Sequence, residues 1–377
     1  MTDRANSGDV ATTPGTPGAD GSPMPARPTL AQVAKRAGVS ASTASLAFSG
    51  AGPVSEDTRE RVLAAARELE YGGPDPRARS LRTGRSGIIA VVMEERIRDA
   101  FTDPMAIAMV DGLADEIGAA GYSLLLLTDS PDRDAGGLRD APMDAAILFG
   151  CSTDLDPAVT VLGQRHVPLV GVETVARDGM SFVNSNDRDA VAESARLLRD
   201  LGHRRVGVIT LPMDRERSRG PLTAERLAAS QAYTGIERLA GVRGVFPEAP
   251  AVTASGSLID EGMLAAATLL DAHPEITAIV AQSDLLAIGA IQAAEERGLT
   301  VPADLSVVGF DGARVDGLTT RVLTTLVQPI ADKGRAAARL ALAALGTDGA
   351  AADRTPGSRE FTSVLRVGDT TGPASTR

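Results

Sequence analysis

From residue 87 onward, short runs of hydrophobic residues alternate with longer stretches in which hydrophobic positions recur every three or four residues. The short runs are almost continuously apolar, which is typical of parallel strands that are covered on both faces. The predicted strands are 87–93, 122–128, 144–149, 167–172, 204–210, 277–281 and 304–310. The predicted helices are 104–120, 155–165, 187–202, 221–239, 258–273 and 283–297.

This alternation of strands and helices predicts a doubly wound α/β body. There are too many strand–helix units for one mononucleotide-binding half, so we expect two parallel sheets. Two such sheets leave a cleft between the carboxyl ends of their strands, where ligands bind in folds of this class.

Residues 29–70 show a different pattern, in which short amphipathic helices are separated by glycines. Thr29 and Gln32 form a capping box, Ser40 caps a second helix that closes at Gly50, and Ser55 begins a third. Helix, tight turn, helix and longer helix is the helix-turn-helix pattern, whose second helix enters the major groove of DNA.

The alternative for these helices is a three-helix bundle that only packs or dimerises. Two observations favour DNA reading instead. The second helix carries the small hydroxyl residues Ser42, Thr43 and Ser45, where a packing helix needs bulk. Residues 27–86 hold ten Lys or Arg against six acids, a net charge of +4 in a chain whose net charge is −11. A basic module joined to an acidic body predicts a polyanion contact at one end.

Composition narrows the classes of protein to which this chain can belong. The single cysteine, Cys151, excludes an internal disulfide and fits a reducing, cytoplasmic compartment. The sequence contains no run of about 18 apolar residues, the length that would predict a membrane-spanning helix. Residues 1–27, rich in Gly, Pro, Ser, Thr and Asp, are expected to be a disordered tail and not an export signal.

Several spaced motifs resemble those of the lac and galactose repressor family of bacterial transcription regulators. They are TLAQVAKRAGVSASTASLAFSG, VSEDTRERVLAAARELEY and ARSLRTGR, in that order. The resemblance implies a helix-turn-helix domain at 28–73 that binds a palindromic operator in double-stranded DNA as a homodimer. The residues it implies for phosphate contact or orientation are Thr29, Leu30, Ser40, Thr43, Ser45, Ser49, Ser55 and Thr58, and those facing bases are Ala41, Ser42 and Leu46.

The sequence departs from the family pattern at Leu46, where an arginine that reads a base is common. An aliphatic side chain cannot make the bidentate contact with guanine and can only touch a thymine methyl. We therefore expect the central bases of the operator to differ from those of better-known members.

The resemblance continues through the body, in VPLVGVE, LRDLGHRRVGVIT, DLLAIGAIQAAEERGLTVPADLSVVGFDG and LTTLVQP. These segments are similar to an effector-binding core of the periplasmic-binding-protein type, with two lobes joined by three crossovers near residues 175, 310 and 345. The implied core spans 87–368, with one lobe from 87–175 and 311–345 and the other from 176–310 and 346–368. Residues 369–377 are expected to be a tail.

The same resemblance implies the residues that hold the effector. They are Met105, Arg226, Asp284 and Asp311. An arginine with two carboxylates suits a polyol, because together they satisfy both the lone pairs and the protons of hydroxyl groups. A sugar is therefore one candidate. The chain has no Trp, however, and a non-sugar ligand or no effector at all stays open.

Residues 74–86 contain four arginines between flexible breaks, in the sequence PDPRARSLRTGR. Asp75 can cap a helix of about two turns that begins at Pro76 and ends at Gly84, and so short a helix is marginal in water. By the resemblance it is a hinge helix that enters the minor groove, with Ala78 and Leu81 facing the DNA. The alternative is a basic linker between domains.

The sequence lacks common motifs for nucleotide binding and metal binding. It has no GxxxxGK[ST] phosphate loop, no HExxH and no pair of CxxC, and its three histidines are far apart. We expect no catalytic activity, cofactor, metal or membrane partner. The predicted function is a DNA-binding transcriptional regulator, as a repressor, controlled by a small molecule. The alternative is a small-molecule binding protein without DNA function.

Overall fold

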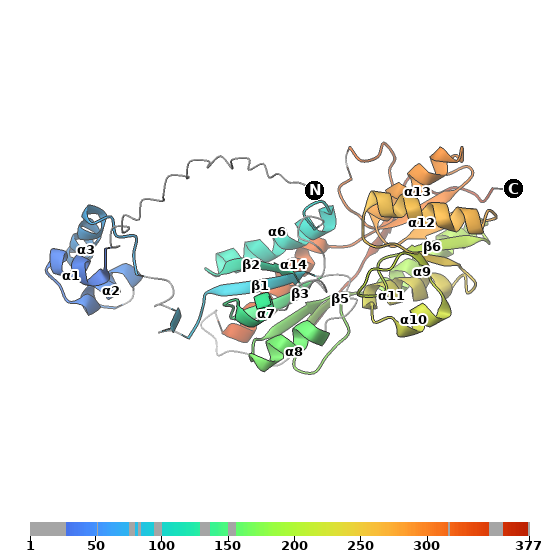
Figure 1. The fold of residues 1–377 in the computed structure, drawn as a ribbon. Helices are drawn as coiled ribbons and strands as arrows, with labels where there is room; N and C mark the ends of the chain where they lie inside the picture. The colour runs from blue at the N-terminus through green and yellow to red at the C-terminus, as the bar shows by residue number, and fades with distance from the viewer. Residues whose placement is uncertain are drawn as a thin grey trace, which may run out of the picture. The chain divides into compact units, whose positions relative to one another are not determined.

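The structure is a computed structural model that describes residues 28–50, 52–74, 80–81, 84–93, 100–128, 136–149, 156–315, 317–346 and 357–375. The chain forms two compact units, residues 1–83 and residues 84–377 (Figure 1). The division falls inside the predicted hinge segment, 74–86. The predicted tail, 1–27, lies outside the described residues.

Three helices form the core of the described part of the first unit, α1 (Leu30–Ala37), α2 (Ala41–Ser49) and α3 (Glu56–Glu68). The predicted caps are confirmed: the hydroxyls of Thr29, Ser40 and Ser55 each accept a hydrogen bond from the amide three residues later. Gly38 ends α1 with φ 71°, a left-handed conformation that favours glycine. The core of the unit is small and made largely of alanine and valine, with Val33, Ala44 and Val62 completely buried.

The second unit contains two lobes, each built on one sheet. The sheet of the first lobe has the order β12-β5-β4-β3-β1-β2, and all its strand pairs are parallel. Its strands are β1 (Ile88–Met93), β2 (Ser123–Thr128), β3 (Ala145–Phe149), β4 (Leu169–Val172), β5 (Ser181–Ser185) and β12 (Ser358–Phe361). Successive residues of β1 point to opposite faces, where Ile89 packs against α6 (Pro104–Ala119) and α14 (Ile330–Leu345). Ala90 packs on the other face, against α7 (Gly136–Asp140) and α8 (Asp156–Gln164).

The second lobe repeats this three-layer arrangement. Its sheet has the order β13-β11-β10-β9-β6-β8-β7, with antiparallel strands at both edges. Its strands are β6 (Val206–Thr210), β7 (Gly220–Pro221), β8 (Ala251–Thr253), β9 (Ala278–Ala281), β10 (Ser306–Asp311), β11 (Thr324–Val327) and β13 (Val364–Arg366). One face packs on α12 (Ile259–Ala272) and α13 (Asp284–Glu296), and the other on α9 (Asp187–Asp200) and α11 (Tyr233–Arg243).

All seven predicted strands are present, within about two residues at each end. The helix predicted over 221–239 differs, because the chain forms α10 (Ala224–Ala229) and then α11. Between them the hydroxyl of Ser230 donates to the carbonyl of Met213 at 2.6 Å and also accepts from the amide of Ala232. The side chain of Ser230 thus replaces the continuing helical hydrogen bonds.

The chain crosses between the lobes later than expected in all three places. The crossovers lie near Asn186, Gln328 and Thr362, compared with the expected positions 175, 310 and 345. Each shift has the same cause, because one further strand completes a sheet before the chain leaves it. These strands are β5, β11 and β12. They were not predicted from the sequence, because each contains no more than two apolar residues.

The segment expected to be a C-terminal tail packs on the second lobe as far as residue 375. Thr370 is completely buried and its hydroxyl donates to the carbonyl of Val307 at 2.7 Å. His203 is also buried, with Nδ1 2.9 Å from the hydroxyl of Thr277 and Nε2 3.1 Å from the carbonyl oxygen of Gly372. Burial lowers the pKa of His203, so it is a neutral link between this segment and the sheet.

The contact between α6 and α14 gives a test of the first lobe. A side chain at Gly112, on α6, would collide with the backbone carbonyl of Ala331 on α14. Gly112→Ala should therefore lower the free energy of unfolding by roughly 1–3 kcal/mol in urea denaturation. Gly118→Ala is the matched control on the same helix, where a Cβ meets no atom within 4 Å. It should raise the stability by about 0.5–1 kcal/mol, and equal effects of the two changes would contradict the packing described.

Candidate functional sites

The exposed surface of α2 is formed by small, hydroxyl and aliphatic side chains. Ala44 and Ala47 are buried against the other two helices, whereas Ala41, Ser42 and Leu46 are exposed. The hydroxyl of Ser40 lies 2.8 Å from both the Ser42 and the Thr43 hydroxyl, so that three hydroxyls gather at the start of the helix. No residue of α2 is charged, and this surface can therefore contact bases only through methyl groups and hydroxyls.

The remaining predicted DNA contacts surround this helix. Thr29, Ser40 and Ser55 cap the three helices, and helix N-termini are favourable places for phosphate oxygens. Leu30, Ser45 and Thr58 are half-buried, and Ser49 is exposed. Of the two predicted hinge residues, Ala78 lies outside the described residues, whereas Leu81 lies in a helical conformation and is 87% exposed.

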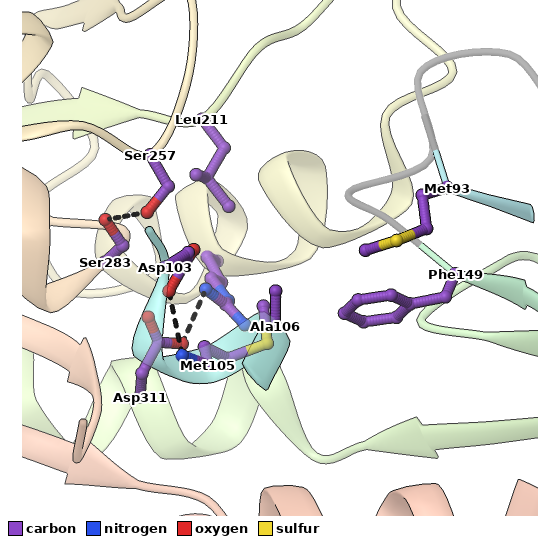
Figure 2. Close-up of a pocket in the computed structure, with 10 residues that line it drawn as sticks. Met93, Asp103, Met105, Ala106, Phe149, Leu211, Ser257, Ser283 and Asp311 are labelled. Atoms are coloured by element: carbon purple, nitrogen blue, oxygen red, sulfur yellow. Dashed lines mark hydrogen bonds and ion pairs between the residues drawn. The ribbon is translucent and has the colours of Figure 1, made fainter. Parts of the chain in front are cut away.

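A second candidate site is a pocket between the two lobes that is open in part to solvent. Met93, Phe149 and Asp311 end strands β1, β3 and β10, and Leu211 directly follows β6. The pocket thus lies where the carboxyl ends of both sheets meet, as expected from the sequence. Its lining residues are Met93, Asp103, Met105, Ala106, Phe149, Leu211, Arg238, Ser257, Ser283 and Asp311 (Figure 2).

The two lobes line the pocket differently. Figure 2 shows Met93 and Phe149 of the first lobe together on one side, apart from Asp103 and Asp311. Apart from Leu211, the second lobe contributes polar groups, including the hydroxyls of Ser257 and Ser283, which lie 2.9 Å apart. A ligand that fits must therefore combine an apolar face with hydrogen-bonding groups.

Arg238 supplies the positive charge of the pocket and is 3% exposed. Its Nε donates to Oδ2 of Asp187 at 2.8 Å, and its Nη1 donates to the carbonyl of Gln282 at 2.6 Å. The guanidinium lies 3.5 Å from the centre of the Phe310 ring, and its Nη1 lies 3.9 Å from Oδ1 of Asp311. A buried charge held in this way has a fixed position at the edge of the pocket.

Three carboxyl groups at or behind the pocket have raised pKa values. Burial raises the pKa of Asp311 well above its usual range, although the nearby charge of Arg238 opposes this effect. Burial likewise raises the pKa of Asp103, whose carboxylate accepts from the Met105 amide at 2.8 Å. Burial raises the pKa of Asp284 to about 6, against hydrogen bonds from Thr325 and Ala313. A raised pKa favours the neutral carboxyl, which can both donate and accept hydrogen bonds, so these groups suit a ligand that carries hydroxyl groups.

The described residues contain no group of three or more His, Cys, Asp or Glu that could hold a metal ion. No helix among them is both long and apolar enough to cross a membrane.

Comparison with known proteins relates both sites to one family. Residues 29–73 match the family described as bacterial regulatory proteins, lacI family, and residues 195–371 match the periplasmic binding protein-like domain. An HTH-type transcriptional regulator of Mycolicibacterium smegmatis is 37% identical over 334 residues, which cover 84% of this chain and 90% of that protein. The chain belongs to the lacI family of bacterial regulatory proteins.

Two solved structures show the same fold. A complex of the transcriptional regulator CelR with cellobiose is 27% identical, with a TM-score of 0.64, and the match covers 91% of this chain and 100% of that one. The lac repressor dimer bound to operator and the anti-inducer ONPF is 22% identical, with a TM-score of 0.71, over 91% and 99% of the two chains. The lacI-family protein is therefore a DNA-binding transcriptional regulator, and the alternative without DNA function is not supported.

The four predicted effector residues of this lacI-family protein occupy different places. Met105 and Asp311 line the pocket. Asp284 is completely buried behind it, where its carboxylate accepts from Thr325 at 2.6 Å and from the Ala313 amide at 2.8 Å. Arg226 is not among the lining residues, and its guanidinium instead holds the loop after β6. It pairs with Asp214 at 3.1 Å and donates to the carbonyls of Ser218, Gly220 and Pro221.

Of the ten residues that line the pocket of the lacI-family protein, Met105 and Asp311 were predicted effector residues, and Arg238 and Ser257 are among those that the sequence did not indicate. Arg238 lies within a helix, where arginine is usually a solvated residue, and only the tertiary structure buries it. Three phenylalanines occupy different places. Phe149 lines the pocket, Phe310 is buried under Arg238, and Phe101 is 56% exposed.

The raised pKa of Asp284 predicts a pH-dependent contribution to the stability of the lacI-family protein. The folded state binds this proton more tightly than the unfolded state, so stability falls as the pH rises from about 4 through 6. Asp284→Asn should remove on the order of 2 kcal/mol of this fall, because one pKa unit corresponds to about 1.4 kcal/mol. Urea denaturation from pH 4 to 7 measures it, with Asp332→Asn, at an exposed side chain, as control. Parallel pH profiles for wild type and Asp284→Asn would contradict the assignment.

Proposed function

We propose that the protein is a homodimeric transcriptional repressor that binds a palindromic operator and responds to a neutral polyhydroxy ligand between its lobes. One observation carries the proposal: a chain with a helix-turn-helix unit also has a pocket lined by polar side chains at the carboxyl ends of both sheets. We assign it no catalytic role and place it in the cytoplasm, with the DNA.

The lining of the pocket supports a neutral polyol as ligand. Hydroxyl groups can donate to Asp103 and Asp311 and can accept from Arg238, while Phe149 and Met93 offer an apolar wall for the C–H face of a ring. A phosphate or carboxylate would find a single arginine as counter-charge, and that arginine is already engaged by Asp187. The similar CelR structure holds cellobiose, so a sugar is one candidate.

Asp284 and Arg226 also belong to this proposal, as residues that act on the ligand through others. Asp284 fixes the loop after β10 by accepting from the Ala313 amide, two residues from Asp311. Arg226 fixes the loop that follows Leu211. We propose that both residues position groups of the pocket.

For the DNA-binding unit, we propose that Ala41, Ser42 and Leu46 face bases and that the hydroxyls around α2 bind phosphates. A dimer with two-fold symmetry carries two such units, so its operator has matching symmetry. We propose further that Ala78 and Leu81 contact the minor groove. Footprinting tests the proposal as a whole: the full chain should protect a palindrome selected from a random DNA pool, and failure to select any site would contradict it.

Leu46 should read a thymine methyl. In the selected half-site, replacing each thymine in turn by uracil removes one methyl group. At one position this should weaken binding about fourfold, as the loss of about 0.8 kcal/mol for one buried methyl implies. The same replacement should have no effect on Leu46→Ala, and binding assays at fixed salt measure both dissociation constants. Equal losses in wild type and Leu46→Ala would exclude this reading.

Asp311 should be required for the ligand and not for DNA. Among neutral sugars and their phosphates, including ribose, ribose 5-phosphate and cellobiose, only neutral members should raise the melting temperature of wild type. Asp311→Asn should weaken their binding at least about tenfold, because hydrogen bonds to charged groups contribute about 1.5–3 kcal/mol. Calorimetric titration measures the affinity, with Asp332→Asn as control. Unchanged affinity in Asp311→Asn, or preferential binding of a phosphate, would contradict the assignment.

A further inference from the structure

Lys333 is a fully buried cation outside the pocket, in the first turn of α14, and is 1% exposed. Its Nζ donates to the carboxylate of Glu173, directly after β4, to the hydroxyl of Ser185 at 3.0 Å, and to Oε1 of Gln328 at 2.7 Å. Glu173 alone supplies the counter-charge for a lysine that only fastens α14 to the first lobe. The hydrogen bond to Gln328 extends the group toward the second lobe.

Gln328 lies at the second crossover, between β11 and α14, and has two polar neighbours of opposite kind. An ammonium group can only donate, so the amide oxygen of Gln328 must face Lys333. The amide nitrogen is thereby turned to Oδ1 of Asp311, to which it donates at 2.7 Å. Lys333 thus determines which end of the Gln328 side chain meets the carboxylate.

Asp311 is held in one orientation by the backbone as well. Its φ of 115° is outside the usual range for a residue with a side chain, and its carbonyl accepts from the Gln328 amide at 3.2 Å. A Cβ at the next residue, Gly312, would lie 2.8 Å from the Cα of Val327. The backbone therefore has no room to turn, and the carboxylate that lines the pocket depends on its side-chain partners for its direction.

The same polar groups lie where the crossovers meet. Ser185 ends β5 at the first crossover. The next residue, Asn186, connects this crossover to the third one. Its backbone amide donates to the carbonyl of Phe361, and its Oδ1 accepts from the Ser363 amide. Glu173 and Lys333 belong to the first lobe and Asp311 to the second. A continuous line of hydrogen bonds thus runs from the first lobe to the pocket. It passes through the crossovers, which together form the hinge between the lobes.

We propose that Lys333 is a positioning residue for the pocket: through Gln328 it directs the Asp311 carboxylate and connects the pocket to the hinge between the lobes. Its regulatory consequence rests on the proposed function. A ligand hydroxyl that donates to Asp311 changes the hydrogen bond that Asp311 accepts from Gln328. Ligand binding in the pocket therefore alters contacts at the hinge between the lobes.

The test uses the full chain without ligand or DNA. Lys333→Met together with Glu173→Gln removes both charges and leaves no buried ion without its partner, which keeps the fold intact. The control is Arg339→Met with Glu116→Gln, which makes the corresponding changes at a more exposed ion pair between α14 and α6. Hydrogen–deuterium exchange is measured by mass spectrometry for peptides covering 306–315 and 324–328, in the second lobe and the hinge.

In the Lys333→Met/Glu173→Gln variant these second-lobe peptides should exchange at least about tenfold faster, and in the control they should match wild type. A lysine that only fastens α14 would change exchange in 169–185 and 330–345 alone, and that result would overturn the proposal. Global stability, measured in urea, separates local opening from complete unfolding.

Gln328→Met provides a second variant that leaves the Lys333–Glu173 pair in place. It should accelerate exchange in 306–315 by itself, and adding the Lys333→Met and Glu173→Gln changes should accelerate it no further, because all act through one link. Additive effects would mean that Lys333 acts on Asp311 by another route, against the proposal. Because no ligand or DNA takes part, this failure is separate from a failure of the ligand or operator experiments.

Discussion

Two positive charges, those of Arg238 and Lys333, are buried at the junction of the two lobes, and the arrangement of the pocket depends on how they are neutralised. Removing a cation from water costs several kcal/mol unless a carboxylate and further hydrogen bonds replace the solvent. Arg238 is paired with Asp187, just after the first crossover, and Lys333 with Glu173, at the end of β4. Among the described residues, Oε2 of Glu173 and Oδ1 of Asp187 are buried without a hydrogen-bond partner. A ligand, or a different angle between the lobes, could bring hydrogen-bond donors to these two oxygen atoms.

Parallel sheets explain why these charges and the pocket lie together. Every strand of a parallel sheet ends at the same edge, so residues far apart in sequence, such as Met93, Phe149 and Asp311, line one space. The three crossovers join the two edges. The hydrogen bonds of Asn186 and Gln328 then connect one crossover to another and to the pocket. The binding site and the hinge are thus one polar structure, which is the requirement for a ligand to bias the angle between lobes.

The sequence predicted the helix-turn-helix unit and both lobes because caps such as Thr29 and continuous apolar runs such as 87–93 are local signals. It did not predict β5, β11 and β12, each of which contains no more than two apolar residues, and the crossovers were therefore placed too early. The pocket was predicted in part. Asp311 could be found because it directly ends a strand, whereas the role of Arg238 depends on burial by Asp187 and Phe310, which are distant in sequence. For Arg226, a family motif indicated the ligand, and the structure shows contacts to a neighbouring loop.

We propose that ligand binding in the pocket and operator binding by the helix-turn-helix unit are thermodynamically coupled. Linkage requires that a ligand change operator affinity by the same factor by which the operator changes ligand affinity. The decisive measurement is the dissociation constant of a pocket ligand, by calorimetric titration, for the free protein and for the protein saturated with its selected operator. The account predicts two values that differ by roughly 5- to 150-fold, matching the reciprocal shift in operator affinity. Identical ligand affinities with and without operator would contradict it.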